Sequence, residues 1–474
     1  MRLSPATADR LAASVTRPAY DRDAQAVGIV HLGIGAFHRA HQAAYTDDAM
    51  NQGDRDWRIV GVSLRSADVH DQLAPQGALY SITERDSAGS RRRLIGALAD
   101  VLVAPHAPGA VVEQLAARAT RIVSLTVTEK GYLGSPDGQL DWASAPIASD
   151  LLGEAPPQSL YGLLRQGLAQ RRAEGLPGLT LISCDNLSGN GDKLRSLLGQ
   201  FLERCDPGLA KWFATECACP STMVDRIVPA TTEADLADVA ATLGLRDDGA
   251  VVTEPFRQWV IEDRFAGPRP RWEAGGAQLV SDVRAYENAK LRMLNGAHSA
   301  LAYLGLFRGH AYVHEAIADP VLRPLVEQVM REAAASLSPA PGQDLARYAD
   351  ALVTRFANSA LPHRLDQIAI DGSQKIPQRW LPTLAWHQGQ GHACPAILTA
   401  LAGWMTFVRG DRFPVADPLA SRLARLWEQC GDDQIVPAFF GEGGLFQDLW
   451  VATPSDRDHL QKTIADLRSG PDAF

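Results

Sequence analysis

The segment AYENAKLRMLNGAHSALAYLG (residues 285–305) places an amine, an amide and an imidazole inside an apolar, helix-forming pattern. At about 100° per residue, Lys290, His298 and Asn295 lie at 0°, about 80° and about 140° and share one broad face. Lys290 and His298 are then roughly 12 Å apart along the helix axis, a distance that one small substrate can bridge. The alternative is a lysine that reaches solvent beside a hydrogen-bonded core histidine.

These residue types suit the oxidation of an alcohol, in which the hydroxyl proton is removed while hydride leaves carbon. A lysine can accept that proton when burial and a nearby positive charge lower its pKa. The amides of Asn186 and Asn295 would stabilise the developing alkoxide. His298 would orient a hydroxyl, and Glu129 would carry the proton onward to water. No cluster of metal-ligand residues is evident, so we expect metal-independent chemistry.

A hydride acceptor is suggested by GIVHLGIGAFHRAHQ (28–42), in which Gly33-x-Gly35 follows an apolar strand pattern directly. When a helix follows such a turn, backbone N–H groups at its start face the pyrophosphate of a dinucleotide. We expect Gly33, Gly35, Ala36 and Phe37 to contact that cofactor. The third glycine position holds His38, so a tight turn needed only for packing is the alternative.

The end of the second predicted strand bears on the choice of cofactor, because an acid there binds the ribose hydroxyls of NAD. Asp68 is the nearest acid and Arg65 the nearest cation in VGVSLRSAD (60–68). Asp68 would favour NAD, whereas Arg65 would accept the extra phosphate of NADP. We predict NAD, with NADP less favoured.

The elements that must hold these residues alternate between strand and helix in the first half of the chain. Buried strands are predicted at 28–33, 57–62, 121–127 and 179–184, which indicates an α/β fold with a parallel sheet. Between the second and third strands, residues 78–98 alternate in character around a Ser-Ala-Gly-Ser turn. This segment predicts an antiparallel hairpin inserted into the nucleotide-binding fold.

Polar residues gather where apolar strand patterns end, in residues 128–132, 183–191, 222–229 and 254–263. Ligands of open α/β sheets collect at the carboxyl ends of the strands. Each segment also has a structural interpretation. Asn186 could cap a helix that begins near Asp192 or form a turn, and Asp225 and Arg226 could form an ion pair.

After about Val283 strand patterns fade and apolar residues recur at three- and four-residue spacing, which predicts helices. A chain of 474 residues is too long for one hydrophobic core. We therefore expect a Rossmann-type domain at 1–283 and a mostly α-helical substrate and catalytic domain at 284–474.

Composition narrows the class of partner. The net charge of −9 argues against nucleic acid, and no apolar run approaches the roughly 20 residues of a membrane span. The N-terminus lacks the apolar core of a secretory signal, and the six cysteines form no CxxC pair. We expect a cytoplasmic protein with free thiols and a small-molecule partner, as a monomer or a small homo-oligomer.

Seven motifs together resemble the long-chain mannitol dehydrogenase family, whose members are metal-independent polyol and sugar-acid dehydrogenases. They are VHLGIGAFHRAHQ, SLTVTEKGY, SCDNLSGNG, MVDRIVP, EPFRQWVIED, KLRMLNGAHS and DGSQKIPQR. The resemblance covers nearly the whole chain and the motifs occur in the family's order. It implies a Rossmann-type N-terminal domain, a largely helical C-terminal domain and an active site between them.

The resemblance also implies roles for single residues. The family's catalytic lysine corresponds to Lys290, in the pattern K-x4-N-x2-H that Asn295 and His298 complete. Its oxyanion asparagines, relay glutamate and substrate-site residues correspond to Asn186, Asn295, Glu129, Asp225 and Lys375. Mannitol 2-dehydrogenases tend to have an arginine eight positions before the lysine that corresponds to Lys375. This chain has Gln367 there, and Arg364 nearby could compensate.

The substrate stays open between a polyol and a sugar acid. QIAIDGSQKIPQR (367–379) looks especially like fructuronate reductases, and a substrate carboxylate would need a cation such as Arg364, Lys375 or Arg379. Polyol dehydrogenases share much of the same sequence. Two other functions are considered: a nucleotide-binding sensor without turnover, and a mannitol-1-phosphate dehydrogenase of the same fold.

Overall fold

The computed structural model describes residues 1–135, 137–153 and 155–470, and the chain divides into two compact units, Met1–Arg284 and Ala285–Phe474. The sequence pattern places the boundary at 283/284. No helix within the described residues is both long and apolar enough to cross a bilayer. Each unit has its own hydrophobic cores.

The first unit is built on a five-stranded parallel sheet with the order β5-β2-β1-β6-β7. The strands are β1 (Val27–Leu32), β2 (Arg58–Ser63), β5 (Leu98–Val103), β6 (Ile122–Leu125) and β7 (Thr180–Ser183). The α/β prediction is confirmed, and the four predicted strands all form. The edge strand β5 was not predicted, because its sequence LADVLV mixes buried and exposed positions.

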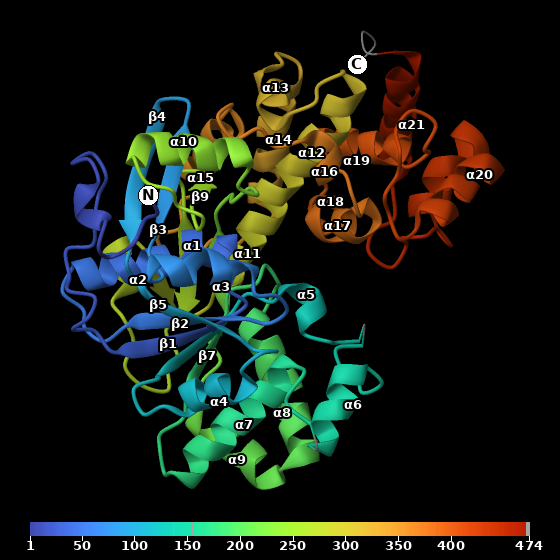
Figure 1. Cartoon of the computed structure of the whole chain (residues 1–474). Coiled ribbons are helices and arrows are strands. Elements are labelled where there is room, and N and C mark those ends of the chain that lie inside the picture. Colours follow the sequence, from blue (N-terminus) through green and yellow to red (C-terminus); the bar gives the residue numbers. More distant parts are fainter. Residues whose placement is uncertain (136, 154, 471–474) are drawn as a thin grey trace. The chain divides into compact units, whose positions relative to one another are not determined.

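Alternation along the strands sends side chains to opposite faces of this sheet. Val30 and Leu32 of β1 join one core, whereas Ile29 joins the other. Helices cover the first face, and Figure 1 shows them below the sheet, one in teal and three in green: α4 (Pro108–Ala116), α7 (Leu160–Ala173), α8 (Asn190–Cys205) and α9 (Pro207–Glu216). The second face packs on α1 (Ala36–Ala40) and α2 (Gln42–Asn51).

The inserted hairpin is confirmed: β3 (Tyr80–Asp86) pairs antiparallel with β4 (Gly89–Ile95). The short strand β9 (Val251–Thr253) adds to β3 in parallel. A further three-stranded sheet contains β8 (Thr222–Asp225), β10 (Gln258–Glu262) and β11 (Gln278–Val280). The remaining helical segments are η1 (Ala8–Arg10), α3 (Asp68–Leu73), η2 (Ala74–Gln76), α5 (Thr128–Gly131), α6 (Ala145–Leu152), α10 (Glu233–Leu243) and η3 (Trp272–Gly275).

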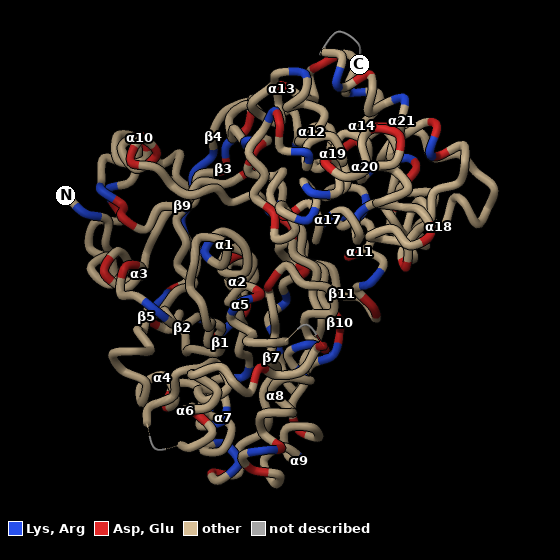
Figure 2. Tube along the Cα trace, turned by 90° about the vertical axis from the view of Figure 1, so that its right-hand side faces the viewer, with Lys and Arg blue, Asp and Glu red and all other residues tan. Residues whose placement is uncertain are grey.

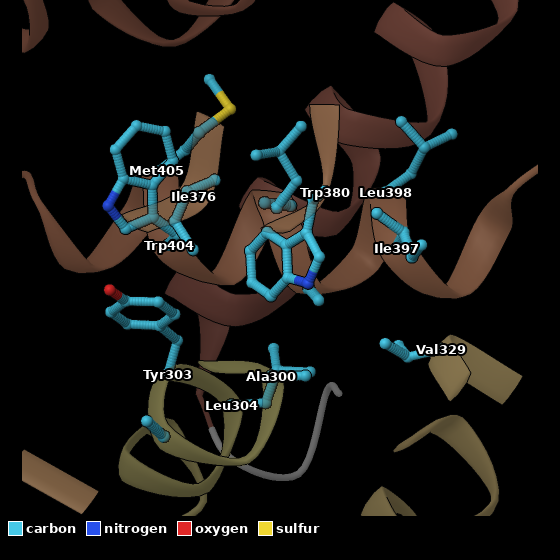
Figure 3. Close-up of a cluster of buried hydrophobic side chains, with 14 of the residues drawn as sticks. Ala300, Tyr303, Leu304, Val329, Ile376, Trp380, Ile397, Leu398, Trp404 and Met405 are labelled. Carbon is cyan, nitrogen blue, oxygen red and sulfur yellow. The ribbon is translucent and has the colours of Figure 1, made fainter. Parts of the chain in front are cut away.

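The second unit is helical, as predicted. Two central helices, α12 (Gly296–Phe307) and α19 (Pro395–Phe407), are buried on nearly every side, which explains why their sequences are apolar all round. Figure 3 shows Tyr303 and Leu304 of α12 facing Trp404, Ile397 and Leu398 of α19 in this core.

The other helices surround that pair. They are α11 (Arg284–Ala289), η4 (Lys290–Asn295), α13 (Val313–Ala318), α14 (Leu322–Ala335), α15 (Leu345–Phe356), α16 (Leu365–Ile368), α17 (Gly372–Arg379), α18 (Leu381–Gly389), α20 (Ala420–Phe440) and α21 (Pro454–Ser469). Acidic and basic residues are interspersed along both units (Figure 2). All six cysteines are free thiols.

Candidate active site

The Gly33–Gly35 turn leaves β1 in a conformation that requires glycine. Gly33 has φ +94°, and a Cβ built on it would lie 2.1 Å from the backbone oxygen of Thr126. The hydroxyl of Thr126 donates to the carbonyl of Gly33 at 2.7 Å, which ties the turn to the end of β6. Gly35 is the N-cap of α1, and a Cβ there would meet only the Gly33 oxygen, at 4.0 Å. The space beside this turn is therefore open.

A cavity of about 410 Å³ lies at the carboxyl ends of β1, β2 and β6, where an open α/β sheet binds its ligand. Its wall is lined by Gly33, Ile34, Gly35, Ser63, Leu64, Arg65, Ser66, Thr126, Val127, Lys130, Gly131, Leu133, Pro146, Gln158, Ser159 and Leu160. A second cavity of similar volume shares Leu64 and residues 158–160, and its other lining residues include four prolines. The two volumes lie in the range of cofactor pockets.

Only some of the residues predicted to contact the cofactor line the cavity. Gly33 and Gly35 line the cavity, whereas Ala36 and Phe37 do not. Phe37 stacks on His41 with ring centroids 4.9 Å apart. Asp68 is exposed and accepts a hydrogen bond from Ser66 at 2.8 Å, outside the cavity wall.

Arg65 and Ser66 form the part of the wall that follows β2. Ser66 was not singled out in the sequence. Its position three residues beyond the end of β2 is the signal that identifies it.

His38, which replaces the third glycine, belongs to a buried stack of imidazoles under the turn. The rings of His31 and His38 are 3.5 Å apart and nearly parallel. His31 is hydrogen bonded to Ser124 at 2.8 Å and to Thr126 at 2.7 Å, so it supports the residue that holds Gly33. Burial lowers the pKa of His31 and that of His41 to about 3.

These imidazoles predict acid lability. In the unfolded chain histidine binds a proton below about pH 6.5, but His31 and His41 stay neutral in the folded protein down to about pH 3. The unfolded state thus gains protons as the pH falls through this window, and stability decreases by on the order of 1 kcal/mol per pH unit for each imidazole.

Urea unfolding at pH 7, 6 and 5 measures this slope. His31→Gln should make it shallower, whereas the same change at exposed His106 should leave it unaltered. A parent protein whose stability does not fall between pH 6.5 and 5 would contradict the expectation.

Asp185 fastens the turn that carries Glu129. Its carboxylate accepts hydrogen bonds from the backbone N–H groups of Val127 (3.2 Å) and Thr128 (2.8 Å) and from the hydroxyl of Tyr132 (2.8 Å). Burial raises the pKa of Asp185, and these donors oppose the shift. Thr128 has φ +62°, a strained conformation for threonine that the two backbone bonds maintain.

Asp185→Ala should therefore destabilise the protein by about 2–4 kcal/mol, because it leaves buried donors without an acceptor. Asp185→Asn retains one acceptor oxygen and should cost less. Denaturant unfolding of both variants measures the difference. Asparagine also keeps the volume of aspartate, so equal losses for the two variants would contradict this expectation and show that the oxygen retained by asparagine does not stabilise the turn.

The other predicted polar residues of this unit lie after the neighbouring strands. Glu129 is exposed, with its carboxylate 3.8 Å from the ammonium of Lys193. Asn186 is exposed in the turn after β7, and Asp225 is buried at the end of β8.

Two structural interpretations of these residues are wrong. Helix α8 begins at Asn190 with Gly189 as its N-cap, so Asn186 does not cap it. Arg226 forms its ion pair with Glu84, at 2.6 Å, and not with Asp225. The cap interpretation failed because α8 has Gly189 as its N-cap, and the ion-pair interpretation failed because the partner of Arg226 is remote in sequence.

The Lys290 helix is not a regular α-helix, which corrects the predicted geometry. Residues Lys290–Asn295 form a π-helical turn between α11 and α12. Its hydrogen bonds run from i to i+5, so each residue turns by less than 100° and the predicted angles do not hold. Lys290 and Asn295 are both half-buried and stand at the first and last positions of this turn. Such turns are frequent at functional sites.

His298 is buried, and its environment does not match a hydrogen-bonded core histidine. The Nε2 atom has no hydrogen-bond partner among the described residues. The ring lies 4.6 Å from Phe356 and 5.5 Å from His363. Burial holds the pKa of His298 well below its usual range, and His363, Arg355 and Arg379 act in the same direction. A neutral imidazole results, able to donate or accept one hydrogen bond.

The DGS motif builds the start of α17. Asp371 takes a left-handed conformation (φ +58°), and Gly372 packs so closely on Trp404 that a Cβ would lie 2.3 Å from its Nε1. Ser373 donates through its backbone and its side chain to Asp417. The motif therefore fixes the direction of a helix that carries Lys375 and Arg379.

The three cations considered for a substrate carboxylate have different environments. Arg364 is exposed and pairs with Asp366 at 2.6 Å. Lys375 donates to the backbone carbonyl of Ile370 at 2.5 Å. Arg379 donates to the Asn295 carbonyl at 3.1 Å and to the hydroxyl of Ser299 at 2.6 Å, so it contacts the helix that carries His298.

Residues 27–274 match the mannitol dehydrogenase Rossmann domain, and residues 282–458 match the mannitol dehydrogenase C-terminal domain. The chain belongs to the mannitol dehydrogenase family. The predicted family and fold class are thus confirmed, since both domain types occur in the predicted order.

Two named relatives and one solved structure are similar to this mannitol dehydrogenase family member over most of its length. The D-mannonate oxidoreductase of Escherichia coli is 40% identical over 446 residues, which cover 92% of each chain. The mannitol 2-dehydrogenase of Phaeosphaeria nodorum is 40% identical over 472 residues, covering 95% of this chain and 83% of the relative. The solved structure of Pseudomonas fluorescens mannitol 2-dehydrogenase with NAD and D-mannitol is 35% identical and covers 99% of this chain and 97% of that one, with a TM-score of 0.83.

Proposed function

We propose that this chain is an NAD-dependent, metal-independent oxidoreductase that transfers hydride between a secondary alcohol of a polyol or sugar acid and the cofactor. The observation that carries the proposal is that a member of this family keeps Lys290, Asn295 and His298 together with an open glycine-turn cavity. Its relatives named above are oxidoreductases of mannitol and mannonate.

The proposed mechanism assigns proton transfer to the protein. When NAD is bound, its nicotinamide supplies the hydride acceptor. Lys290 accepts the hydroxyl proton of the substrate as general base. The amides of Asn186 and Asn295 donate hydrogen bonds to the developing alkoxide. Glu129, which is exposed beside Lys193, passes the proton to water.

Substrate orientation is assigned to His298, whose unpartnered Nε2 can bond a hydroxyl. Asp225, Arg364 and Lys375 are proposed as further substrate contacts. The buried carboxylate of Asp185 holds the turn that carries Glu129 in one conformation through its backbone hydrogen bonds, so the last group of the proposed proton path has a fixed position.

The cavity of the first unit fits a dinucleotide. Gly33 and Gly35 let the backbone approach a pyrophosphate, and the proline-lined cavity beside Leu64 suits a planar base. We keep Ala36, Phe37 and Asp68 as proposed cofactor contacts. NAD is proposed over NADP because the P. fluorescens relative is an NAD complex. Arg65 lies in the cavity wall and could accept the extra phosphate of NADP, so we also expect a measurable rate with NADP.

The proposed setting is the cytoplasm, since six free thiols suit a reducing compartment. We propose a monomer or a small homo-oligomer with a small-molecule substrate.

Initial rates with mannitol, arabinitol, glucitol and D-mannonate, each with NAD and with NADP, test the proposal. Turnover with at least one of them and a preference for NAD are expected. NADH binding without any rate would instead identify a nucleotide-binding sensor. Activity confined to mannitol 1-phosphate and fructose 6-phosphate would identify a 1-phosphate dehydrogenase.

A further inference from the structure

Arg379 is a guanidinium without an acidic partner. It ends α17, is half-buried, and its Nη1 donates to the Asn295 carbonyl (3.1 Å) and the Ser299 hydroxyl (2.6 Å). Within the described chain it forms no ion pair. Its Nε and Nη2 atoms make no hydrogen bond to those residues either. Because part of the side chain remains exposed, a small ligand can reach it.

The absence of a carboxylate is unusual for such a position. Arginines removed from water are normally paired, since leaving a partly buried charge uncompensated costs free energy. Burial lowers the pKa of Arg379 from 12.5 to about 10, and Tyr303 acts in the opposite direction. At neutral pH the side chain still carries its charge, so the site holds an unbalanced cation.

The imidazole of His298 lies within the electrostatic influence of Arg379. The groups that act on its imidazole are His363, Arg355 and Arg379, and each disfavours protonation. Arg379 acts on Lys375 in the same way, while Asp371 and Asp417 oppose it. Asp417, however, is already bonded to the backbone and hydroxyl of Ser373 at the other end of α17. An anion beside Arg379 and His298 would balance the positive charge of Arg379.

We propose that Arg379 binds a carboxylate of the substrate and that this chain therefore acts on a sugar acid in preference to a neutral polyol. The inference rests on the proposed function and deepens it. The unoccupied Nε and Nη2 donors form the fork that matches the two oxygens of one carboxylate. The same arginine contacts the backbone of Asn295, so the carboxylate end would be fixed relative to an amide that serves the reacting alcohol.

A carboxylate is favoured over a phosphate by the number of donors. Arg364 and Lys375, proposed above as further substrate contacts, already donate to Asp366 and to backbone carbonyls, so of the three cations only Arg379 presents a free fork. One free fork satisfies a carboxylate, whereas a phosphate dianion presents three oxygens and a larger charge. Phosphorylated substrates are an outcome of the test.

The experiment compares kcat/KM for D-mannonate, D-mannitol and fructose 6-phosphate in the parent and in Arg379→Gln, Arg379→Lys and Arg323→Gln. Arg323 is an exposed arginine of α14 paired with Glu327, so it controls for loss of one positive charge. Thermal unfolding and NADH titration confirm that each variant folds and binds cofactor.

We expect the parent to prefer mannonate over mannitol by at least about 100-fold in kcat/KM. Arg379→Gln should lower kcat/KM for mannonate by about 100-fold, mainly through KM, and should bring the acid-to-polyol ratio towards one. Arg379→Lys should recover part of the loss, because a point charge replaces the fork. Arg323→Gln should leave the ratio unaltered.

The outcomes separate the two proposals. Equal or better turnover of mannitol, or an Arg379→Gln variant that loses both substrates in proportion, overturns the sugar-acid inference and leaves the oxidoreductase assignment intact. A preference for fructose 6-phosphate overturns it likewise. No rate with any substrate, despite NADH binding, overturns the proposed function and the inference with it.

Discussion

Replacing Lys290 with alanine is expected to lower kcat by about 10³-fold while NADH binding stays nearly unchanged. A positioned general base contributes roughly 10²–10⁴-fold to proton transfer, and the proposed mechanism contains no second group that can take this role. Lys290 is the first residue of a π-helical turn and Asn295 is the last. Removing the lysine side chain therefore eliminates the base but leaves the amide. Single-turnover rates and NADH fluorescence titration measure the two quantities.

The matched control for Lys290 is Lys462, which is exposed on α21 and paired with Asp466. Lys462→Ala should retain the parent rate. A small primary amine such as ethylamine should restore part of the activity of Lys290→Ala, because it supplies the missing base from solution. Turnover of Lys290→Ala near the parent rate at neutral pH would rule out the base assignment.

Substitutions of the two turn glycines are expected to separate folding from cofactor binding. Gly33→Ala places a Cβ against the Thr126 oxygen and forces alanine to φ +94°. It should destabilise the first unit by at least about 2 kcal/mol, since such a backbone conformation alone costs roughly 1–3 kcal/mol. The measurement is the free energy of unfolding in urea.

Gly35→Ala should instead leave stability nearly unchanged, because φ is −104° and a Cβ meets nothing closer than 4.0 Å. It should raise the KM for NAD at least about tenfold, because the added methyl occupies space that the pyrophosphate needs. Thr126→Val should destabilise the first unit less than Gly33→Ala does, since it removes only the hydroxyl that donates to the Gly33 carbonyl. An unaltered affinity for NAD in a folded Gly35→Ala protein would show that the cofactor does not bind at this turn.

Local patterns predicted the parts of the molecule that depend on nearby residues. Apolar β-branched runs identified β1, β2, β6 and β7, and the Ser-Ala-Gly-Ser turn identified the β3–β4 hairpin, because strand and turn preferences act over a few residues. The edge strand β5 and the short strands β8, β9, β10 and β11 escaped recognition as sheet members. The exposure pattern of β5 is mixed, and the other four strands are only three to five residues long, too short for a clear pattern.

The candidate site divides in the same way. The sequence alone determined which residue types occur, in which order, and that Gly33 and Gly35 form a turn after a strand. Only the tertiary structure decided that Lys290 begins a π-helical turn, that His38 stacks on His31, and that Arg364 is paired while Arg379 lacks an acid. The reason is physical. Residue types and spacing do not decide which side chains meet, even for pairs as near in sequence as Arg364 and Asp366, because that depends on how the strands and helices pack. This packing involves partners that are remote in sequence, as Arg379 and Ser299 are.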